Sequence, residues 1–322
     1  MAFRRVLIAG AGMRTAFGAA TAGGAACATI AYAARCEGAV TGVQPMVFFS
    51  DLDKTLVGGD ADGLKAWSAY WEAEERLKHK SVLCYNTGRC IADFERELAP
   101  LLPVPDVLIC GDGLEVRWCS DREHGKLQLD EEWEQRIRHH WDDSGLRERV
   151  IARMQPLDEG LIDGLNDAAN SPPRGEARWA ITVRGAEKAR ALARELEETF
   201  NGAVISYAMK GWDAQGLSYV VVVLPAISGK ANAAKYVQAR LGAPDVSCVA
   251  AGDSENDATM LGTPYAFVAV SNASPGLVEA LDAAGAPERH VRVEGACAYG
   301  VIEGLRHLRR TRLRPSTVPV EG

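Results

Sequence analysis

Two aspartates, Asp51 and Asp53, lie one residue apart in the stretch FFSDLDKTLVGGD, just where a run of hydrophobic residues ends. On an extended strand, side chains at i and i+2 share one face, so these carboxylates repel each other unless a positive charge lies between them. Solvated acidic turns are common, and the pair alone does not decide between a turn and a catalytic site. The repulsion nevertheless requires a physical reason.

Further polar groups follow other hydrophobic runs of the chain. They are Asn86-Thr87-Gly88-Arg89, Gly111-Asp112-Gly113 and the stretch GDSEND of residues 252–257, while the pair Gly229-Lys230 opens a helical stretch. In open parallel sheets, ligands bind at the carboxyl ends of the strands. We therefore expect four strand ends to bring their polar residues to one rim of a sheet, and this ordered combination is far more specific than the DxD pair alone.

Five short apolar runs predict buried strands, each followed by a turn or helix signal. These runs are Met46–Ser50, Val82–Tyr85, Val107–Cys110, Val246–Ala251 and Ala266–Val270. Continuous apolar runs of this length are typical of a parallel sheet that is covered by helices on both faces. The predicted fold class is therefore α/β, with a three-layer Rossmann-like core.

The segment from Trp118 to about Pro225 differs in composition from the flanking chain and predicts an α+β insertion that covers the rim. It is charged, is interrupted by Pro172-Pro173, and holds Trp133, Trp141, Trp179 and Trp212. The pattern predicts strands at Trp179–Val183 and Ser218–Leu224 and a helix at Ala186–Phe200. Gly211-Trp212-Asp213 is typical of an exposed turn, which makes Trp212 a candidate for contact with a ligand, although a large aromatic side chain more often packs in a core.

Length, charge and cysteine content restrict the class of partner. The chain has 322 residues, 47% of them hydrophobic, and a net charge of −7, so it shows no electrostatic attraction for nucleic acid or an anionic membrane surface. A small soluble ligand is the expected partner, and nothing indicates the oligomeric state. The eight cysteines include no CxxC pair and no zinc spacing with histidine, which favours free thiols in a reducing compartment.

The first 36 residues contain four arginines and no acid, a composition typical of a targeting leader. We expect residues 1–45 to form a leader or a disordered extension, with a plastid or mitochondrion as the destination and a cytoplasmic location as the alternative. Thr15–Ala34 is uncharged, but its glycines and alanines make it a poor bilayer span, so no stable membrane span is expected. The stretch VLIAGAGMRT lacks the third glycine of a dinucleotide-binding motif, and we reject that interpretation.

The DxD pair, TGR, GK and GDSEND, in that order, resemble the motifs of the haloacid dehalogenase superfamily of aspartate-based phosphatases. The longer stretches YWEAEERLKHKSVLCYNTGR, PDVLICGDGLEV and EGACAYGVIEGL resemble the sucrose-phosphate phosphatases and related sugar phosphatases, which carry a cap between the second and third motifs. The resemblance implies a catalytic core at residues 46–117 and 226–308, an α+β cap of the C2 type at 118–225, and a tail at 309–322.

The resemblance also implies a role for each acid and thereby explains the opening pair. Asp51 would be the nucleophile that forms an aspartyl-phosphate, and Asp53 would protonate the leaving sugar oxygen and then activate the hydrolytic water. Mg²⁺ would be held by Asp51, the Asp53 backbone carbonyl, Asp253 and Asp257. The carboxylates are then tolerated because a cation joins them.

The rest of the implied site consists of donors and cations, because negative charge spreads over the equatorial oxygens during phosphoryl transfer. The implied contacts to the phosphoryl group come from the Thr87 hydroxyl, the region of Gly88 and Arg89, Lys230 and Asn256. Lys230 would add its charge to the preference of a helix N-terminus for anions.

Neighbouring polar residues have structural explanations. Thr55 either shapes the loop after the nucleophile or contacts the site directly, and Ser254 belongs to the metal's outer shell or to the phosphate site. Asp60, Asp62 and Asp112 are interpreted as turn acids.

The cap sequence departs from the family pattern at one point that concerns the substrate. Residues 216–225 read GLSYVVVVLP, whereas sucrose phosphatases usually carry S-G-x-D-x-D-x-L-P, so Val220 and Val222 stand where sugar-gripping carboxylates would be. Sucrose 6-phosphate is the first candidate substrate, and another hexose or disaccharide phosphate is the alternative. A phosphomutase or a non-catalytic sugar-phosphate sensor on the same scaffold stays open, although the intact acids and Lys230 argue against a sensor.

Overall fold

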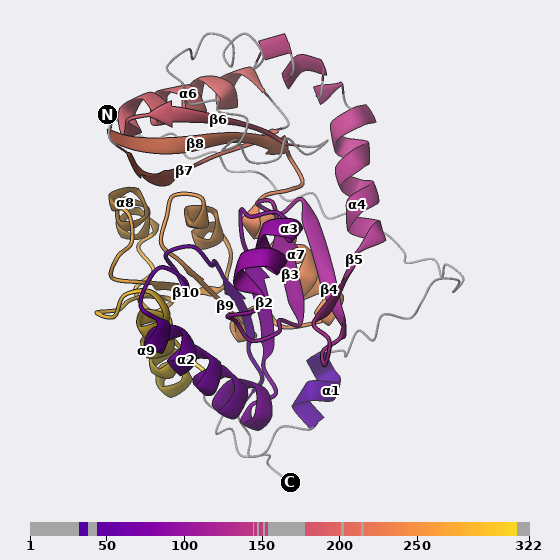
Figure 1. The fold of residues 1–322 in the computed structure, drawn as a ribbon, viewed down its shortest axis with the longest axis vertical. Helices are drawn as coiled ribbons and strands as arrows, with labels where there is room; N and C mark the ends of the chain where they lie inside the picture. Colours follow the sequence, from indigo (N-terminus) through magenta and orange to yellow (C-terminus); the bar gives the residue numbers. More distant parts are fainter. Residues whose placement is uncertain are drawn as a thin grey trace.

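The structure is a computed structural model that describes residues 32–37, 44–143, 145–146, 148–150, 152–153, 178–200, 203–213 and 216–313. These residues form a larger core built on an eight-stranded sheet and a smaller part built on a three-stranded sheet above it (Figure 1). Most of the expected leader, the Pro172-Pro173 break and the end of the expected tail lie outside the described residues.

The eight-stranded sheet has the order β11-β10-β9-β1-β2-β3-β4-β5, and the strands from β11 to β3 run parallel. Their bounds are β1 Val47–Ser50, β2 Val82–Asn86, β3 Val107–Cys110, β4 Glu115–Asp121, β5 Lys126–Leu129, β9 Cys248–Gly252, β10 Ala266–Ala269 and β11 His290–Arg292. Every residue of β1, β2, β3, β9 and β10 is buried, as their continuous apolar runs predict. The five expected strands and the α/β fold class are confirmed.

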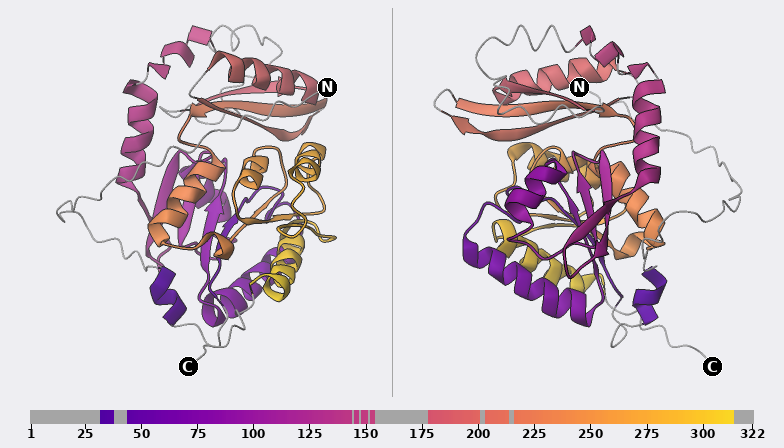
Figure 2. Two further views of the ribbon diagram at one scale, coloured as in Figure 1. Left: turned by 180° about the vertical axis from the view of Figure 1, so that it is seen from behind. Right: turned by 45° about the vertical axis from the view of Figure 1, so that its right-hand side comes forward.

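Helices cover both faces of this sheet because alternate strand residues point to opposite sides. On one face, Phe49 and Ile109 pack with α4, α7, α8 and the 3₁₀ helix η5; on the other, Phe48 and Leu108 pack with α2, α9 and the π-helical turns η1 and η2 (Figure 2). The bounds are α2 Ala61–Tyr70, η1 Trp71–Lys78, α3 Ile91–Asp93, η2 Phe94–Leu98, α4 Glu131–Arg138, η3 His139–Asp143, α7 Lys230–Leu241, η4 Asp245–Ser247, η5 Asp257–Gly262, α8 Pro275–Ala284 and α9 Cys297–Thr311.

The core sheet continues further along the chain than expected. β4 and β5 add two antiparallel strands to it, so the boundary predicted at residue 118 falls inside β4. The following helix α4 also packs on the core, since the Trp133 indole donates to the Gly113 carbonyl at 3.0 Å. Its N-cap Asp130 accepts from the Trp118 indole at 2.7 Å and from the Tyr236 hydroxyl at 2.9 Å. These buried aromatic partners fix the segment to the core.

The smaller part, which we call the cap, is an antiparallel sheet in the order β6-β8-β7 with a helix on its outer face (Figure 1). Its elements are β6 Trp179–Arg184, α6 Ala186–Thr199, β7 Ala203–Asp213 and β8 Gly216–Pro225. The predicted strands and helix are confirmed. The exposed turn predicted at residues 211–213 is wrong, because Trp212 pairs with Leu217 at the end of the β7–β8 hairpin.

The described part of the expected leader packs on the core. Helix α1, Tyr32–Glu37, places the Tyr32 hydroxyl 2.7 Å from both the Pro45 carbonyl and the Ser247 hydroxyl, and Arg35 pairs with Asp106 at 2.6 Å. The boundary expected at residue 45 therefore does not separate folded from unfolded chain.

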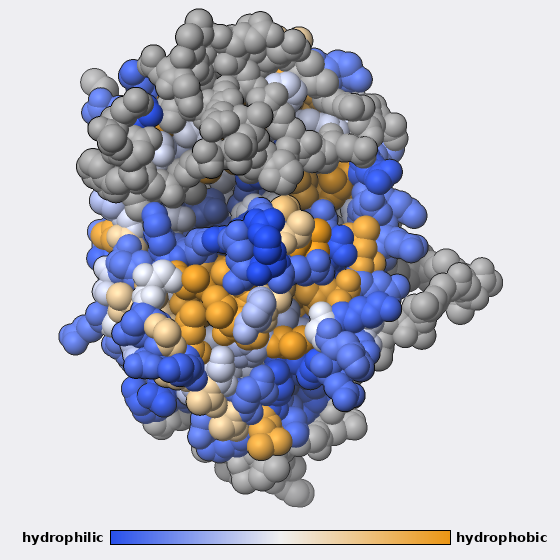
Figure 3. Space-filling model, viewed as in Figure 1, coloured by the Kyte–Doolittle hydropathy of each residue, from blue (hydrophilic) through white to orange (hydrophobic). Residues whose placement is uncertain are grey.

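The molecular surface is mixed in character. The face of the core in Figure 3 shows patches of apolar surface among charged side chains. Within the described ranges, no helix combines the length and the apolar composition that crossing a membrane requires.

Candidate active site

The parallel pairing of β1 with β9 brings the first two acids together. Ser50 pairs with Ala251, and the Asp51 amide donates to the Ala251 carbonyl at 3.0 Å, so Asp51 and Asp253 leave the same edge of the sheet. Asp257 folds back onto this edge, where it contacts Gly252: a Cβ on that glycine would lie 2.4 Å from the Asp257 Cβ. Glycine at this position lets the third carboxylate reach the other two.

Asp51, Asp253 and Asp257 form a buried group whose carboxylate oxygens lie within 4.8 Å of one another. We call it the aspartate cluster. Burial raises the pKa of Asp51 to about 7, with Lys230 opposing the shift and Asp257 adding to it. Burial, together with the charges of Asp51 and Asp257, raises the pKa of Asp253 to about 8. Three buried carboxylates that offer hard oxygen donors fit a Mg²⁺ site.

Lys230 supplies the fixed positive charge beside the aspartate cluster. Its Nζ lies 2.6 Å from Asp51 Oδ1 and 2.7 Å from Asp257 Oδ1, and its side chain is only 3% exposed. Burial alone would lower the pKa of Lys230, but the nearby carboxylates of Asp257, Asp51 and Asp112 outweigh it and raise the pKa. Lys230 therefore stays charged and favours the ionised form of the nucleophile.

The start of α7 reaches the site because two loops approach closely. Gly113 lies so near Gly229 that a Cβ on it would be 2.5 Å from the Gly229 carbonyl oxygen. The Asn86 amide at the end of β2 donates to the Lys230 carbonyl at 3.0 Å. These contacts tie the ends of β2 and β3 to the helix that carries Lys230.

Thr55 contacts the site directly. Its buried hydroxyl lies 3.1 Å from Asp51 Oδ2 and 3.0 Å from Asp253 Oδ1. The Thr55 hydroxyl therefore bridges the two carboxyl groups and helps hold them at the same edge of the sheet.

Asp53 lies outside the aspartate cluster. Its carboxylate is about half exposed and receives two hydrogen bonds from Arg89, from Nε and Nη2, each 2.7 Å long. Arg89 also pairs with Glu97. A carboxylate held beside the nucleophile but open to solvent suits proton exchange, and Arg89 fixes its orientation. Contact between Arg89 and a phosphoryl group stays a prediction.

The other predicted phosphate contacts lie around the end of β2. The fully buried Thr87 hydroxyl accepts from the Arg89 amide at 3.1 Å, and Gly88 lies against Asp112. Asn256 donates from Nδ2 to Asp112 Oδ1 at 3.3 Å and accepts from the Ser254 hydroxyl at 2.7 Å. The structure thus brings all the predicted residues to one rim, with Asp53 and Arg89 at its exposed side.

Asp112 lies in a turn, as predicted. Of the other two predicted turn acids, Asp60 caps α2, and Asp62 lies in the first turn of that helix, where it is exposed. Asp112 is buried and pairs with Arg178, the residue before β6 in the cap, at 3.0 Å. Its place after a predicted strand at the same rim was the sequence signal for this role. No local pattern marks Arg178, because the cap folds it onto the core.

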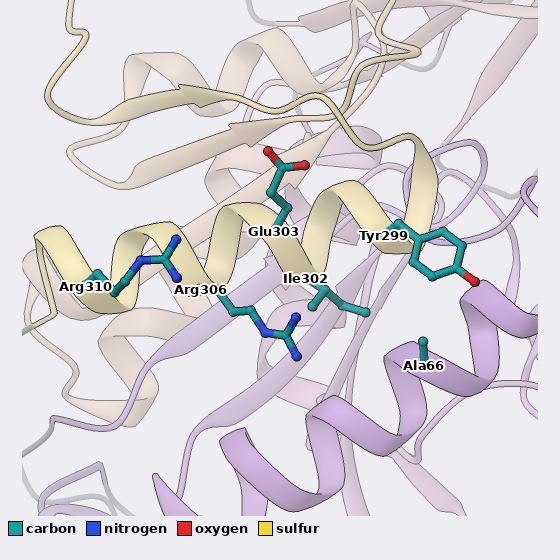
Figure 4. Close-up of a pocket in the computed structure, with 6 residues that line it drawn as sticks. All are labelled: Ala66, Tyr299, Ile302, Glu303, Arg306 and Arg310. Carbon is teal, nitrogen blue, oxygen red and sulfur yellow. The ribbon is translucent and has the colours of Figure 1, made fainter.

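The distinct hollow of about 310 Å³ on the core surface lies elsewhere. Figure 4 shows it between α2 and α9, where none of its lining residues belongs to the rim; they are Ala66, Tyr299, Ile302, Glu303, Arg306 and Arg310. We assign no chemistry to it.

The sequence was compared with models of known protein families. The model described as sucrose-6F-phosphate phosphohydrolase matches residues 44–162 and 183–309, which include both the core motifs and the cap. The chain belongs to the sucrose-6F-phosphate phosphohydrolase family. The resemblance to sucrose-phosphate phosphatases predicted from the motifs is confirmed, and the chain is a phosphatase.

Solved structures show the same fold. The sucrose-phosphatase from Synechocystis sp. PCC6803, determined with sucrose and phosphate, is 22% identical, covers 81% of this chain and 97% of its own, and has a TM-score of 0.63. A haloacid dehalogenase-like hydrolase from Bacillus subtilis is 18% identical over 84% of this chain and 94% of its own, with a TM-score of 0.52. A phosphatase of the haloalkanoate (HAD) enzyme superfamily from Bacteroides thetaiotaomicron is 18% identical over 82% of this chain and 94% of its own, with a TM-score of 0.53. Comparison with curated proteins gave no match.

The cap face is apolar at the positions where the family resemblance predicts carboxylates. Val222 is 2% exposed and clusters with Ala180 and Leu224, and Leu114 of the core packs against them. Val220 is partly buried at the same cluster. The described cap surface at these positions is therefore apolar.

Proposed function

We propose that this chain is a Mg²⁺-dependent phosphomonoesterase that hydrolyses a sugar phosphate through an aspartyl-phosphate on Asp51. The observation that carries the proposal is the aspartate cluster, with Lys230 bonded to two of its members, at the carboxyl ends of β1 and β9. Asp51, Asp253 and Asp257 would hold Mg²⁺, which would offset their repulsion and draw charge from the phosphoryl oxygens.

The chain's own residues divide the chemistry in two steps. An Asp51 oxygen attacks phosphorus while the bond to the sugar oxygen breaks, and Asp53 gives its proton to that oxygen. Asp53 then takes a proton from water, whose oxygen attacks the phosphorus and releases inorganic phosphate, restoring the Asp51 carboxylate. Arg89 orients Asp53, and Lys230 keeps Asp51 ionised.

Sucrose 6-phosphate is the first candidate substrate. The family description names that ester, and the relative from Synechocystis was solved with sucrose and phosphate. The apolar cap face of Val222 and Val220 makes other hexose and disaccharide phosphates the next candidates. A phosphomutase would use the same acids but return the phosphoryl group to a sugar, and the acceptor distinguishes the two. A sugar-phosphate sensor is disfavoured by the complete set of acids with Lys230.

Phosphate release from a panel of sugar phosphates tests the proposal. The panel holds sucrose 6-phosphate, glucose 6-phosphate, fructose 6-phosphate and trehalose 6-phosphate, each assayed with Mg²⁺, after chelation, and after Mg²⁺ is added back. We expect release from at least one ester, loss on chelation and recovery on add-back. Undiminished turnover without metal would contradict the assigned metal ligands. Conversion of one sugar phosphate into another without release of inorganic phosphate would favour the phosphomutase.

A further inference from the structure

One buried ion pair joins the cap to the core directly above the rim. The Arg178 Nη2 lies 3.0 Å from Asp112 Oδ2, and the two side chains are 8% and 7% exposed. Arg178 leads into β6 of the cap, while Asp112 follows β3 of the core in a backbone conformation with φ of +57°. Both positions lie outside the roles assigned above.

Asp112 lies against the loop that is predicted to receive the phosphoryl group. Its amide donates to the Thr87 carbonyl at 3.1 Å, and a Cβ on Gly88 would lie 3.0 Å from Asp112 Oδ1. The same oxygen accepts from the Asn256 amide. A carboxylate in this place repels a phosphate dianion unless its charge is neutralised.

Arg178 supplies that neutralisation and has a donor to spare. Its Nη2 is bonded to Asp112, while its Nε is buried and has no hydrogen-bond partner among the described residues. A buried donor without a partner is unfavourable by itself and indicates a place for a ligand oxygen. The Arg178 guanidinium therefore contacts the Asp112 carboxylate through Nη2 and keeps Nε available as a donor to a ligand oxygen.

The site must open for substrate to enter. Asp51, Asp253 and Lys230 are all at most 7% exposed, and Leu114 of the core packs against the cap face. Movement of the cap would separate Arg178 from Asp112, because the two residues belong to different parts of the fold. Opening would thus uncover the Asp112 charge beside the phosphate loop.

We propose that the Asp112–Arg178 pair couples cap closure to anion affinity. With the cap closed, Arg178 neutralises Asp112 and its Nε donates to an oxygen of the bound ester or phosphate. With the cap open, the unpaired Asp112 carboxylate repels inorganic phosphate and speeds its release. Arg178 contacts the ligand, whereas Asp112 is a positioning residue that acts through Arg178, and this inference rests on the proposed function.

Inorganic phosphate is the probe, and its binding is measured by calorimetry in the presence of Mg²⁺ with four single variants and one double variant. Arg178→Gln is expected to weaken phosphate binding about tenfold, because it leaves one buried charge unpaired at the site. Arg178→Lys, which keeps the charge but lacks the Nε donor, is expected to lose less affinity than Arg178→Gln. Arg194→Gln, an exposed arginine of α6, is the matched control and is expected to change nothing.

The double variant decides between a coupled pair and a merely structural contact. Asp112→Asn should bind phosphate at least as tightly as wild type and show stronger product inhibition, and adding Asp112→Asn to Arg178→Gln should restore most of the lost affinity. Unchanged binding in Arg178→Gln, or a double variant that binds as weakly as that single variant, overturns the proposal.

The phosphate-binding experiment also decides the proposal if Arg178→Gln fails to fold or if the wild-type protein hydrolyses no ester. If Arg178→Gln does not fold, Asp112→Asn carries the test, and weaker phosphate binding in this variant overturns the proposal. If the wild-type protein binds phosphate but hydrolyses no ester, the proposed function fails, while the affinities still decide whether the pair controls anion binding.

Discussion

The rim of the core and the face of the cap above it differ sharply in chemistry. The rim gathers Asp51, Asp253 and Lys230 within hydrogen-bonding reach of one another or of Thr55, whereas the cap presents Ala180, Val222 and Leu224. Under the proposed function, the core would act on any phosphate ester, and the cap would contact the sugar alcohol of one particular ester. Catalysis by the rim and substrate selection by the cap must therefore be tested separately.

The largest expected effect comes from removing the nucleophile. Asp51→Asn should lower kcat by at least about 1,000-fold for every ester, because an amide neither attacks phosphorus nor carries the charge that Lys230 balances. The fold should persist, as judged by circular dichroism, since the substitution preserves the size of the side chain.

Asp62→Asn is the matched control for that variant. Asp62 is an exposed acid of α2 that pairs only with Lys65 among the described residues, so its kcat should equal that of the wild type. Equal activity of Asp51→Asn and Asp62→Asn would break the assignment of chemistry to the rim.

An intermediate effect is expected from metal and pH on stability. The pKa values of Asp51 and Asp253 are raised on folding, so the metal-free native state holds more protons than the unfolded chain above about pH 4. Stability of the metal-free protein should therefore fall as the pH rises through the range from about 4 to about 8. Mg²⁺ displaces these protons and should raise the melting temperature more at pH 8 than at pH 6.

Thermal unfolding with and without Mg²⁺ at the two pH values measures this difference. If Mg²⁺ raised the melting temperature at pH 6 by as much as at pH 8, or by more, the result would contradict a metal site made of the aspartate cluster. The cap contributes none of its described residues to the aspartate cluster, so we attribute the Mg²⁺-dependent change in melting temperature to the core.

The smallest effect is expected from the cap. Val220→Asp places a carboxylate on the partly buried cap position where the family pattern has one, and should change kcat/KM for sucrose 6-phosphate by up to about tenfold. Its kcat for p-nitrophenyl phosphate should stay unchanged, since that ester has no sugar. A parallel loss on both substrates would mean that the cap residue acts on the chemistry itself. Val222→Asp is unsuited to this test, because it buries an unpaired charge.

The core was predictable from sequence, and the cap contacts were not. Apolar runs ending in acids mark β1 and β9, and parallel pairing then places Asp51 beside Asp253 without further information. Asp112 is flanked by glycines, so it resembles an ordinary turn until its burial is seen. Arg178 precedes a cap strand, and its partner is 66 residues earlier in the chain, a pairing that only tertiary structure creates.

Strand content was also underestimated where local signals are weak. β4 alternates half-buried with buried residues over most of its length, and β5 alternates exposed with half-buried residues, so both lack the continuous apolar runs of the central strands. The end of β7 contains Gly211 and Asp213, which favour turns, yet pairing with β8 keeps it extended. In both places a neighbouring strand decides the conformation.

The most direct test of the central claim is to identify the residue that carries the phosphoryl group. Borohydride added during turnover reduces an aspartyl-phosphate to homoserine, which peptide mass spectrometry locates. We predict homoserine at position 51, dependent on both Mg²⁺ and substrate. Continued turnover with reduction at another residue, or with Asp51 unmodified under conditions that trap a reference aspartyl-phosphate, would contradict the account.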